Sequence, residues 1–357
     1  MKESLANTAL HAQLSATALL ERSRDLCMPR LREAVSRLAS PMDMVAAYHF
    51  GWTDRHGKPT IGDGGKMVRP ALAALSAQAV GGDPAAGSLG GVAVELVHNF
   101  SLLHDDFMDG DQIRRNRATA WTVFNPTLAI LTGDALLMLA SEVLLNSPAH
   151  STSLHDRARA AQRLTTASRR LIDGQASDLS FEHRDRITIQ NCLEMEGKKT
   201  GALLACASAV GAVLAGADDA TADALGRYGH HLGLAFQAVD DVLGIWSDPE
   251  VTGKPRWGDL RRRKKSLPVC AALAEGGTAS QRLADLLAAT HNGDHEDEQQ
   301  LAEQASLIEA AGGRAWAEGE ARRQHDKAIA GLDEVTMPEG VRASFVTLAE
   351  FVVNRKR

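Results

Sequence analysis

Apolar residues recur every three or four positions along almost the whole chain of 357 residues, and no stretch alternates convincingly with a period of two. A period near 3.6 is typical of amphipathic helices, whereas half-buried strands alternate with a period of two. The pattern therefore predicts an all-α protein. The predicted helices cover residues 6–38, 41–48, 68–80, 86–109, 118–124, 127–146, 152–179, 188–196, 199–214, 218–247, 264–275, 279–292, 298–328 and 338–354.

The breaks between these helices are rich in Gly, Pro or acidic residues, and none has the composition of a Ser/Gly linker between domains. We therefore expect one all-helical domain over residues 1–357, in which residues 1–40 form an N-terminal helical region. The main breaks lie at residues 51–65, 81–84, 249–258, 291–298 and 336–340.

Composition and charge exclude several classes of protein. The formal net charge of −6 argues against general nucleic-acid binding, which needs a basic surface. Residues 1–30 are polar throughout, so we expect no signal peptide. The apolar stretch 201–217 is short and rich in Ala and Gly, which favours a buried helix over a transmembrane segment. The four cysteines form no C-x-x-C pair, so we expect free thiols and a cytoplasmic protein.

A first acidic cluster ends an apolar helix, in the segment E-L-V-H-N-F-S-L-L-H-D-D-F-M-D of residues 95–109. Asp105 and Asp109 would lie one turn apart on one face of that helix. Their carboxylates repel each other, and a magnesium ion reverses that repulsion because it is a hard cation that binds oxygen ligands and bridges carboxylates to phosphates. A solvated acidic helix end is the alternative interpretation.

A second acidic cluster, Asp240 and Asp241, ends the apolar segment F-Q-A-V-D-D-V-L-G-I-W of residues 236–246. Two such helix ends could face each other across a cavity. They would then hold several magnesium ions around one diphosphate, with the metals acting as electrophiles on the leaving group.

Basic residues follow both clusters and stand in two further short segments. A diphosphate carries several negative charges, so metals and cationic side chains must neutralise it together. Taken alone, each of these cations would be interpreted as an ordinary surface residue. Only their combination with the two acid pairs makes the pattern specific. They are Arg114 and Arg115 after the first cluster, Lys254, Lys264 and Lys265 after the second, Lys66 and Arg69 in G-G-K-M-V-R-P, and Lys199 beside Thr200 in G-K-K-T-G.

These motifs, in this order over residues 41–357, resemble the trans-prenyl-diphosphate synthase (polyprenyl synthetase) family. The resemblance implies a single-domain helical bundle of isoprenoid synthase type around a deep central cavity. It also implies a homodimer and three magnesium ions, with Asp105, Asp109 and Asp240 as metal ligands. D-D-F-M-D matches the family's first aspartate-rich motif in full.

The resemblance further implies a role for each matching residue. Lys66, Arg69 and His98 would bind isopentenyl diphosphate. Arg114 would hold the allylic diphosphate and Arg115 the isopentenyl diphosphate. Other residues that fit the family's motifs are Asp106, Gly174, Gln175, Asp178, Lys199, Thr200, Phe236, Gln237, Asp241, Lys254, Lys264 and the basic tail Arg355–Arg357.

The chain departs from the family pattern at two places. The second acidic motif usually reads D-D-x-x-D, and Gly244 stands at its last position, so a ligand is missing or Asp248, one turn further on, replaces it. Asn116 and Ala118 stand where the family usually has Gly and Pro, which we expect to alter a turn more than the chemistry.

The reaction that the resemblance implies is magnesium-assisted ionisation of the allylic diphosphate, followed by attack of isopentenyl diphosphate on the allyl cation. A proton then leaves to the departing diphosphate, and Lys199, the Thr200 carbonyl region and Gln237 would stabilise the cation. Two alternatives remain, a class I terpene cyclase on the same fold and a non-catalytic partner subunit. A cyclase has no use for an isopentenyl diphosphate site, and a dead subunit would lose acids from its first motif.

Product length is expected to depend on the residues that precede Asp105. At 1.5 Å rise per residue, Ser101 and Phe100 lie about 6–7.5 Å deeper along the helix. Ser101 is small enough to let a prenyl tail pass, and Phe100 is bulky enough to form a floor. Similarity to enzymes with an aromatic only at the fifth position back predicts geranylgeranyl diphosphate as the product, with farnesyl diphosphate as the alternative.

Overall fold

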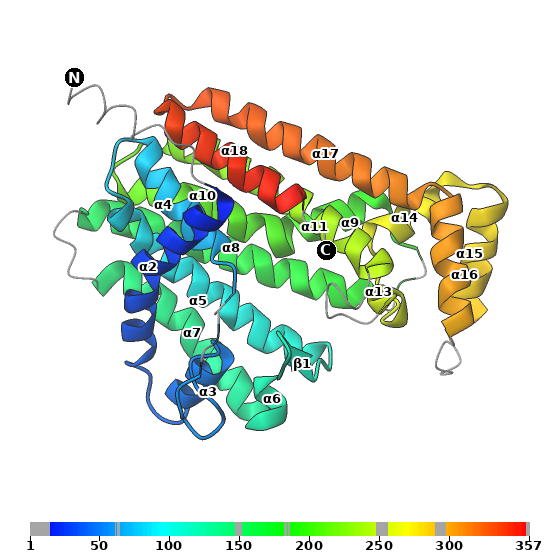
Figure 1. Ribbon diagram of the computed structural model, residues 1–357, viewed down its shortest axis with the longest axis horizontal. Helices are drawn as coiled ribbons and strands as arrows, with labels where there is room; N and C mark the ends of the chain where they lie inside the picture. Colours follow the sequence, from blue (N-terminus) through cyan, green and yellow to red (C-terminus); the bar gives the residue numbers. More distant parts are fainter. Residues whose placement is uncertain are drawn as a thin grey trace. The chain divides into compact units, whose positions relative to one another are not determined.

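The computed structural model describes residues 15–60, 62, 65–146, 152–181, 184, 186–247, 256–289 and 298–354 (Figure 1). Helices make up most of this part and strands almost none of it, which confirms the prediction of an all-α fold. Its strands are β1 (Ile113–Arg114) and β2 (Arg117–Ala118), which pair antiparallel in a hairpin that the hydrophobic pattern did not predict. Two residues per strand are too few for any periodicity to show.

The chain divides into two compact units, each assembled from separate stretches of sequence. Unit 1 comprises residues 1–168, 203–229 and 331–348, and unit 2 comprises residues 169–202, 230–330 and 349–357. The long helices α8 (Leu154–Phe181), α11 (Asp219–Trp246) and α18 (Glu339–Val353) each contribute residues to both units. The first acidic cluster belongs to unit 1 and the second to unit 2.

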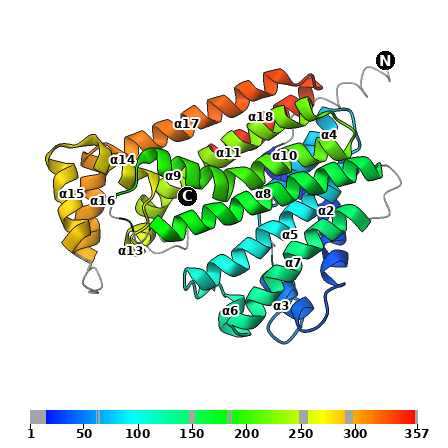
Figure 2. The ribbon, with the colours of Figure 1, turned by 180° about the vertical axis from the view of Figure 1, so that it is seen from behind.

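In unit 1, the backbones of neighbouring helices approach closely because small residues face each other. A Cβ atom on Gly87 or Gly211 would lie 2.3 or 1.8 Å from the carbonyl oxygen of Ala73, so glycine is required at both contacts. The helices of this unit include α2 (Ala16–Val35), α3 (Met42–His49), α4 (Val68–Ala79), α5 (Pro84–Met108), α6 (Ala120–Val123), α7 (Pro126–Asn146) and α10 (Ala202–Leu214). Figure 2 shows α5 and α7 side by side, as their extensive packing requires.

Helix α5 carries the first acidic cluster at its C-terminal end. Asp83 caps the helix by accepting a 2.8 Å hydrogen bond from the backbone N–H of Ala85, and Pro84 occupies the first helical turn, where its missing N–H costs nothing. The middle of the helix is buried on all sides, and Val92 and Leu96 are fully inaccessible. Helix α5 is therefore a fixed core element that holds its last turn in place.

In unit 2, the second acidic cluster lies near the C-terminal end of α11, and a π-helical segment, η2 (Gly197–Gly201), connects α9 to α10. Cys192, Met195 and Leu267 belong to the buried cluster that holds α9 beside α14. The remaining helices with residues in this unit include α9 (Ile189–Glu196), α13 (Gly258–Arg261), α14 (Leu267–Glu275), α15 (Gly277–Ala289), α16 (Glu298–Ala310) and α17 (Gly313–Gly331).

Most predicted helix boundaries hold to within a few residues. Of the helix predicted over 6–38, residues 6–14 lie outside the described residues, and α2 begins at Ala16. The short helix α13 was not predicted, and two further predictions differ from the structure. The single helix predicted over 298–328 is wrong, because α16 ends at Ala310 and α17 begins at Gly313. Gly312 between them has a φ of 78°, which a continuing helix cannot accommodate. The helix predicted from residue 199 begins instead as the π-helical segment η2, which a search for a period of 3.6 does not distinguish.

The apolar stretch 201–217 lies largely in α10, whose residues are almost all buried in the packed helices, as predicted. Within the described residues one helix, α7, is long and apolar enough to cross a membrane, and 44% of its most apolar 18-residue window is buried. A partly buried core helix of this kind is weak evidence for a membrane span.

Candidate active site

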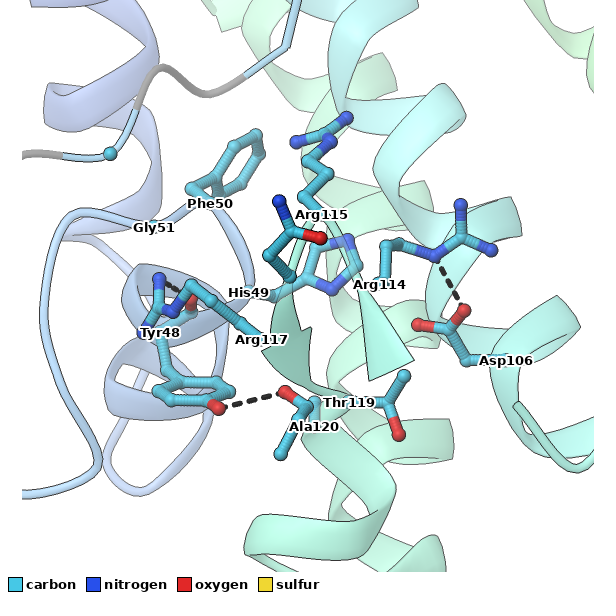
Figure 3. Close-up of a pocket in the computed structure, with 13 residues that line it drawn as sticks. Tyr48, His49, Phe50, Gly51, Asp106, Arg114, Arg115, Arg117, Thr119 and Ala120 are labelled. Carbon is cyan, nitrogen blue, oxygen red and sulfur yellow. Dashed lines mark hydrogen bonds and ion pairs between the residues drawn. The ribbon is translucent and has the colours of Figure 1, made fainter. Parts of the chain in front are cut away.

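The first acidic cluster contains one buried and two accessible carboxylates. Asp106 is 1% exposed, and its Oδ1 accepts a hydrogen bond of 2.5 Å from Nε of Arg114 (Figure 3). Asp105 is partly buried, and Asp109 is exposed at the C-cap of α5, one turn later on the same face. Asp105 and Asp109 therefore have the spacing expected of metal ligands, whereas Asp106 fixes Arg114.

Burial raises the pKa of Asp106 despite the ion pair with Arg114. Among the described residues, Oδ2 of Asp106 has no hydrogen-bond partner. A single cation, on a side chain that is itself 30% exposed, does not offset the loss of hydration around a fully covered carboxylate.

The hairpin of β1 and β2 presents the arginine pair. Arg114 pairs with Arg117 across the strands, and the two residues between them, Arg115 and Asn116, have positive φ values of 51° and 58°. Such a two-residue turn normally needs Gly, Asn or Asp because the left-handed region is costly for most side chains. Asn116, which stands where the family usually has Gly, is one of the residue types that accommodate the positive φ of such a turn.

Beside the hairpin lies a pocket of about 490 Å³ lined mainly by its arginines and by the 48–51 segment (Figure 3). Arg117 is fixed there by a 2.8 Å hydrogen bond to the Thr53 carbonyl and by its position 4.4 Å from the centre of the Tyr48 ring. Burial, together with the charges of Arg115 and Arg114, lowers the pKa of His49 to about 3, so His49 is neutral. The lining is therefore cationic and suits an anion. Sequence analysis missed Tyr48, His49 and Arg117.

Unit 1 also brings together the residues predicted to bind isopentenyl diphosphate. A Cβ atom on Gly65 would meet the Arg115 guanidinium at 2.8 Å, so Arg115 lies against the loop that carries the exposed Lys66. Burial, followed by the charges of Arg69 and Arg115, lowers the pKa of His98 well below its usual value. Four of the predicted residues thus share one cationic neighbourhood, in which His98 is the neutral member.

The second acidic cluster is organised around Asp241, which is fully buried. Its Oδ1 accepts hydrogen bonds from Nζ of Lys264 and Nε2 of Gln237, both at 3.0 Å, and its Oδ2 accepts one from the Leu267 N–H at 2.9 Å. Gln237 in turn accepts a 3.1 Å hydrogen bond from the hydroxyl of Thr200. Asp240, the residue before Asp241, is partly exposed and is the accessible carboxylate of the pair.

These contacts decide the charge states of the pair. Burial alone would raise the pKa of Asp241, but the Lys264 charge and the hydrogen-bond donors lower it below its usual value. Burial would lower the pKa of Lys264, and the carboxylates of Asp241, Asp259 and Asp178 raise it instead. Both side chains are therefore ionised at neutral pH.

Lys199, in the π-helical segment, donates a 2.7 Å hydrogen bond to Asp178.

The position left without an acid by Gly244 is occupied by Asp259 from α13. A Cβ atom on Gly244 would lie only 2.1 Å from Oδ2 of Asp259, so the carboxylate fills the space one turn after Asp240. The same oxygen lies 3.9 Å from Nζ of Lys264. The expected substitute, Asp248, lies outside the described residues, as do Lys254 and Arg355–Arg357. Sequence analysis did not identify Asp259.

A model of the family described as polyprenyl synthetase matches residues 51–305 of this chain. The chain belongs to the polyprenyl synthetase family. It is accordingly a trans-prenyl-diphosphate synthase, a transferase of prenyl groups, with the all-α isoprenoid synthase fold. This confirms the family, the fold class and the enzyme class predicted from the sequence.

Two curated relatives of this polyprenyl synthetase come from Mycobacterium tuberculosis. A (2E,6E)-farnesyl diphosphate synthase is 45% identical over 334 residues, covering 94% of this chain and 92% of the relative. A geranylgeranyl diphosphate synthase is 42% identical over 343 residues, covering 95% and 94%. A crystal structure of a polyprenyl synthetase from Streptomyces coelicolor is 62% identical with a TM-score of 0.90, covering 95% of this chain and 99% of that one. These similarities indicate a short-chain product and leave its length open.

Polyprenyl synthetases use a divalent metal, and the acids of this chain fit a magnesium ion that completes its coordination with substrate. Among the described residues no group of three or more His, Cys, Asp or Glu side chains is arranged to hold a metal ion alone. Magnesium is commonly bound by one or two carboxylates together with waters and substrate phosphates. Asp105 with Asp109, and Asp240 in the other unit, provide donor sets of that kind.

Proposed function

We propose that this enzyme condenses isopentenyl diphosphate with an allylic diphosphate in the cytoplasm and releases mainly geranylgeranyl diphosphate. The observation that carries the proposal is the end of α5, where two accessible carboxylates, Asp105 and Asp109, lie one turn apart beside the fixed cation Arg114. A diphosphate leaving group needs this combination of metal ligands and a positive side chain.

In this proposal, Asp105, Asp109 and Asp240 hold magnesium, about three ions per active site, as implied by the family pattern. The bound metal would supply electrophilic assistance to the departure of diphosphate. Asp259 supports the second cluster in place of the acid missing at Gly244, since its carboxylate fills that position.

The protein side chains have separate tasks. Lys66, Arg69, His98 and Arg115 bind isopentenyl diphosphate, and Arg114 binds the allylic diphosphate with Lys254 and Lys264. Thr200 and Gln237 are already joined by a hydrogen bond, which orients their oxygens toward one another and supports a role in stabilising the allylic cation. Lys199 contributes its charge next to them, held by Asp178.

The test is an assay of the purified protein with magnesium, isopentenyl diphosphate and each allylic primer, with products resolved by chain length. Lys66→Ala and Arg69→Ala should raise KM for isopentenyl diphosphate far more than KM for the primer, because they remove charge from only one substrate. Arg227→Ala, which removes an exposed arginine ion-paired to Glu334, is the matched control. A hydrocarbon formed from one long prenyl diphosphate, unaffected by these changes, would establish the terpene cyclase instead.

The proposed product length rests on the turn of α5 before Asp105. Phe100 is 5% exposed, and its ring packs edge-to-face on His104 with 4.8 Å between the ring centroids, so it is held rigidly. The small Ser101 side chain donates a 2.8 Å hydrogen bond to the His98 carbonyl and turns back on its own helix. A rigid aromatic floor beside a small residue supports a tail longer than that of a farnesyl product.

Phe100→Ala should therefore lengthen the product and Ser101→Phe should shorten it toward farnesyl diphosphate, as measured by chromatography of the dephosphorylated alcohols. Phe181→Ala removes another buried aromatic residue, in unit 2, and controls for general loosening of the core. If neither substitution changes the product distribution of a folded, active enzyme, this part of α5 does not set the length.

We also propose that the enzyme is a homodimer that pairs through α7. Leu131, Met138 and Leu145 recur every seven residues and are 48%, 65% and 41% exposed. A stripe of large apolar side chains on one helix face costs free energy when it is left in water. A second copy of the same helix would cover it, and this explains the apolar character of α7 without a membrane. Met138→Lys should shift the mass measured by light scattering from dimer to monomer, whereas Glu194→Lys, at an exposed position of α9, should not.

A further inference from the structure

The N-terminal helix α2 contacts the loop that carries Lys66. Nη2 of Arg24, on α2, donates a 2.7 Å hydrogen bond to the backbone carbonyl oxygen of Gly65, which lies 41 residues later in the chain. Arg24 is partly buried, and both residues belong to unit 1. A hydrogen bond from a charged donor is stronger than one between neutral groups, so this contact attaches the loop firmly to α2.

The backbone on either side of Lys66 needs such an attachment. Gly65 has a φ of 92° and Met67 a φ of 55°, so Lys66 stands between two residues with positive φ. This region is unfavourable for a side chain such as that of Met67, and it persists only where surrounding contacts hold the backbone there. Met67 is held by its side chain, which is 3% exposed, and Gly65 is held by Arg24.

Arg115 contacts the same glycine from the hairpin. A Cβ atom on Gly65 would lie 2.8 Å from Nη2 of Arg115, so that guanidinium packs directly against the glycine. The carbonyl oxygen that Arg24 binds belongs to the peptide group that joins Gly65 to Lys66. The hydrogen bond therefore fixes the point from which the exposed Lys66 side chain extends, beside Arg115.

Helix α2 is itself fixed to the core of unit 1, so Arg24 extends from a rigid support. The helix packs on α4 and α5, and its Cys27 is 1% exposed. One turn after Cys27, Nη1 of Arg30 donates hydrogen bonds to the Ala85 carbonyl at 2.9 Å and to the Ser88 hydroxyl at 2.8 Å, both on α5. The position of the Arg24 guanidinium is therefore set by the same core that holds α5.

The buried Glu95 shows that Arg24 shares the surroundings of other residues proposed to bind isopentenyl diphosphate. Glu95 is 4% exposed, and its Oε1 accepts a 3.1 Å hydrogen bond from Nδ2 of Asn99. Burial raises the pKa of Glu95, and the positive charges of Arg69, Arg115 and Arg24 oppose that rise. Arg24 thus belongs to the same cationic neighbourhood as Arg69 and Arg115.

We infer that Arg24 is a positioning residue for isopentenyl diphosphate, because its hydrogen bond to the Gly65 carbonyl keeps Lys66 where the diphosphate binds. The inference rests on the proposed function of Lys66 and adds a residue to that site. Arg24 lies outside the motifs of the family and outside the residues 51–305 that match the family model. The N-terminal helix is thereby assigned a part in substrate binding.

The first test compares Arg24→Met with Arg24→Lys in steady-state kinetics at saturating magnesium. Arg24→Met keeps the apolar stem and removes the donor, so KM for isopentenyl diphosphate should rise about tenfold, while kcat and KM for the allylic primer stay within about twofold. Arg24→Lys keeps a charged donor on a shorter side chain and should recover part of the loss. Arg22→Met, at an exposed position of the same helix, is the matched control and should behave as the wild type.

The second test measures binding and does not depend on turnover. Isothermal titration calorimetry with isopentenyl diphosphate alone gives its Kd for the wild type and for Arg24→Met at about 0.05 and 0.5 M salt. Salt screens the attraction between separated charges, whereas the loss of a fixed loop position persists at high salt. The Kd of Arg24→Met should therefore exceed that of the wild type by a similar factor at both salt concentrations.

A wild-type KM for isopentenyl diphosphate in Arg24→Met, or a Kd difference that disappears at high salt, would overturn the positioning role. Equal rises in both KM values together with a lowered urea midpoint would also overturn it, because Arg24 would then only support the fold. A wild-type protein that neither binds nor consumes isopentenyl diphosphate would overturn the proposed function, and the role of Arg24 with it. The two failures are thus distinguishable.

Discussion

The second aspartate of each acidic cluster is buried and paired with a cation, yet the two carboxyl groups differ in pKa. Asp106, on α5, has one hydrogen-bond donor, Arg114, and burial raises its pKa. Asp241, on α11, accepts hydrogen bonds from three nitrogen donors, which together with the Lys264 charge overcome the same effect of burial and lower its pKa. At these two positions, the number of hydrogen-bond donors, rather than the presence of an ion pair, decides whether the pKa of the buried carboxyl group lies above or below its usual value.

The difference assigns different work to the two residues. Asp241 connects α11 to the segment around Lys264 and to the first turn of α14, through Leu267, and so belongs to the framework of unit 2. Asp106 connects only to the hairpin, through Arg114, and keeps one oxygen without a described partner. We therefore expect Asp241 to matter for stability and Asp106 for the position of one arginine.

The largest expected effect concerns one accessible acid of each cluster, Asp105 in the first and Asp240 in the second. Asp105→Ala and Asp240→Ala should each lower kcat by roughly 10²–10³-fold, because each removes a ligand that stabilises charge developing on the leaving group. Both variants should unfold close to the wild-type denaturant concentration, since both carboxylates are partly exposed to solvent. Near-wild-type turnover of folded Asp105→Ala would place the chemistry elsewhere.

The next largest effect is on stability, and it should distinguish the two buried acids, Asp241 and Asp106. Asp241→Asn should lower the free energy of unfolding by about 3 kcal/mol, because Lys264, only 27% exposed, loses its charged partner. Asp106→Asn should cost less than Asp241→Asn, since burial disfavours the charged form of Asp106 and the amide oxygen still accepts the hydrogen bond from Arg114. Urea denaturation followed by circular dichroism measures both, and equal losses would contradict the distinction.

The pH dependence of those losses should differ in sign and in range. The raised pKa of Asp106 means that its contribution to stability is present at low pH and is lost as pH rises above about 4. The lowered pKa of Asp241 means that its contribution is constant above about pH 4 and is lost below it. Between pH 6 and 4, the difference between wild type and Asp106→Asn should therefore change, whereas that between wild type and Asp241→Asn should not.

The smallest effect concerns Gly244. Gly244→Ala would push the Asp259 carboxylate away, and because this is the end of a flexible side chain, the cost in stability should be about 1 kcal/mol or less. The magnesium concentration needed for half-maximal rate should rise if Asp259 supports the second cluster. Gly258→Ala, whose added Cβ would meet only the Gly244 carbonyl oxygen at 4.0 Å, is the control. An unchanged magnesium requirement would remove Asp259 from the site.

Sequence alone predicted the parts of the site that depend on neighbouring residues. The helix that ends in Asp105, Asp106 and Asp109 follows from local periodicity, and the motif order gave the family. The family pattern gave Asp105 and Asp109, but not Asp106, as metal ligands. It did not predict that Arg114 of the hairpin folds back onto the end of α5 and pairs with Asp106. The position of Asp259 was equally hidden, since only the folded chain brings α13 against Gly244.

The errors in the predicted fold have local causes. Gly312 and Gly313 stand together, and this pair was a signal for the break between α16 and α17 that the otherwise helical pattern outweighed. The π-helical segment has no comparable signal, because one extra residue in a turn leaves the apolar pattern almost unchanged.

The contacts of Arg117 bear on how this protein survives proteases. The hairpin presents Arg114, Arg115 and Arg117 within four residues at the surface, which is a sequence that trypsin-like enzymes recognise. Cleavage requires the segment to unfold locally and to bind in an extended conformation to the protease. Such local unfolding is rare where side-chain contacts stabilise the folded backbone. Arg117 fastens this hairpin to the Tyr48 ring and the Thr53 carbonyl. We therefore expect Arg117 to slow digestion after Arg114 and Arg115 as well.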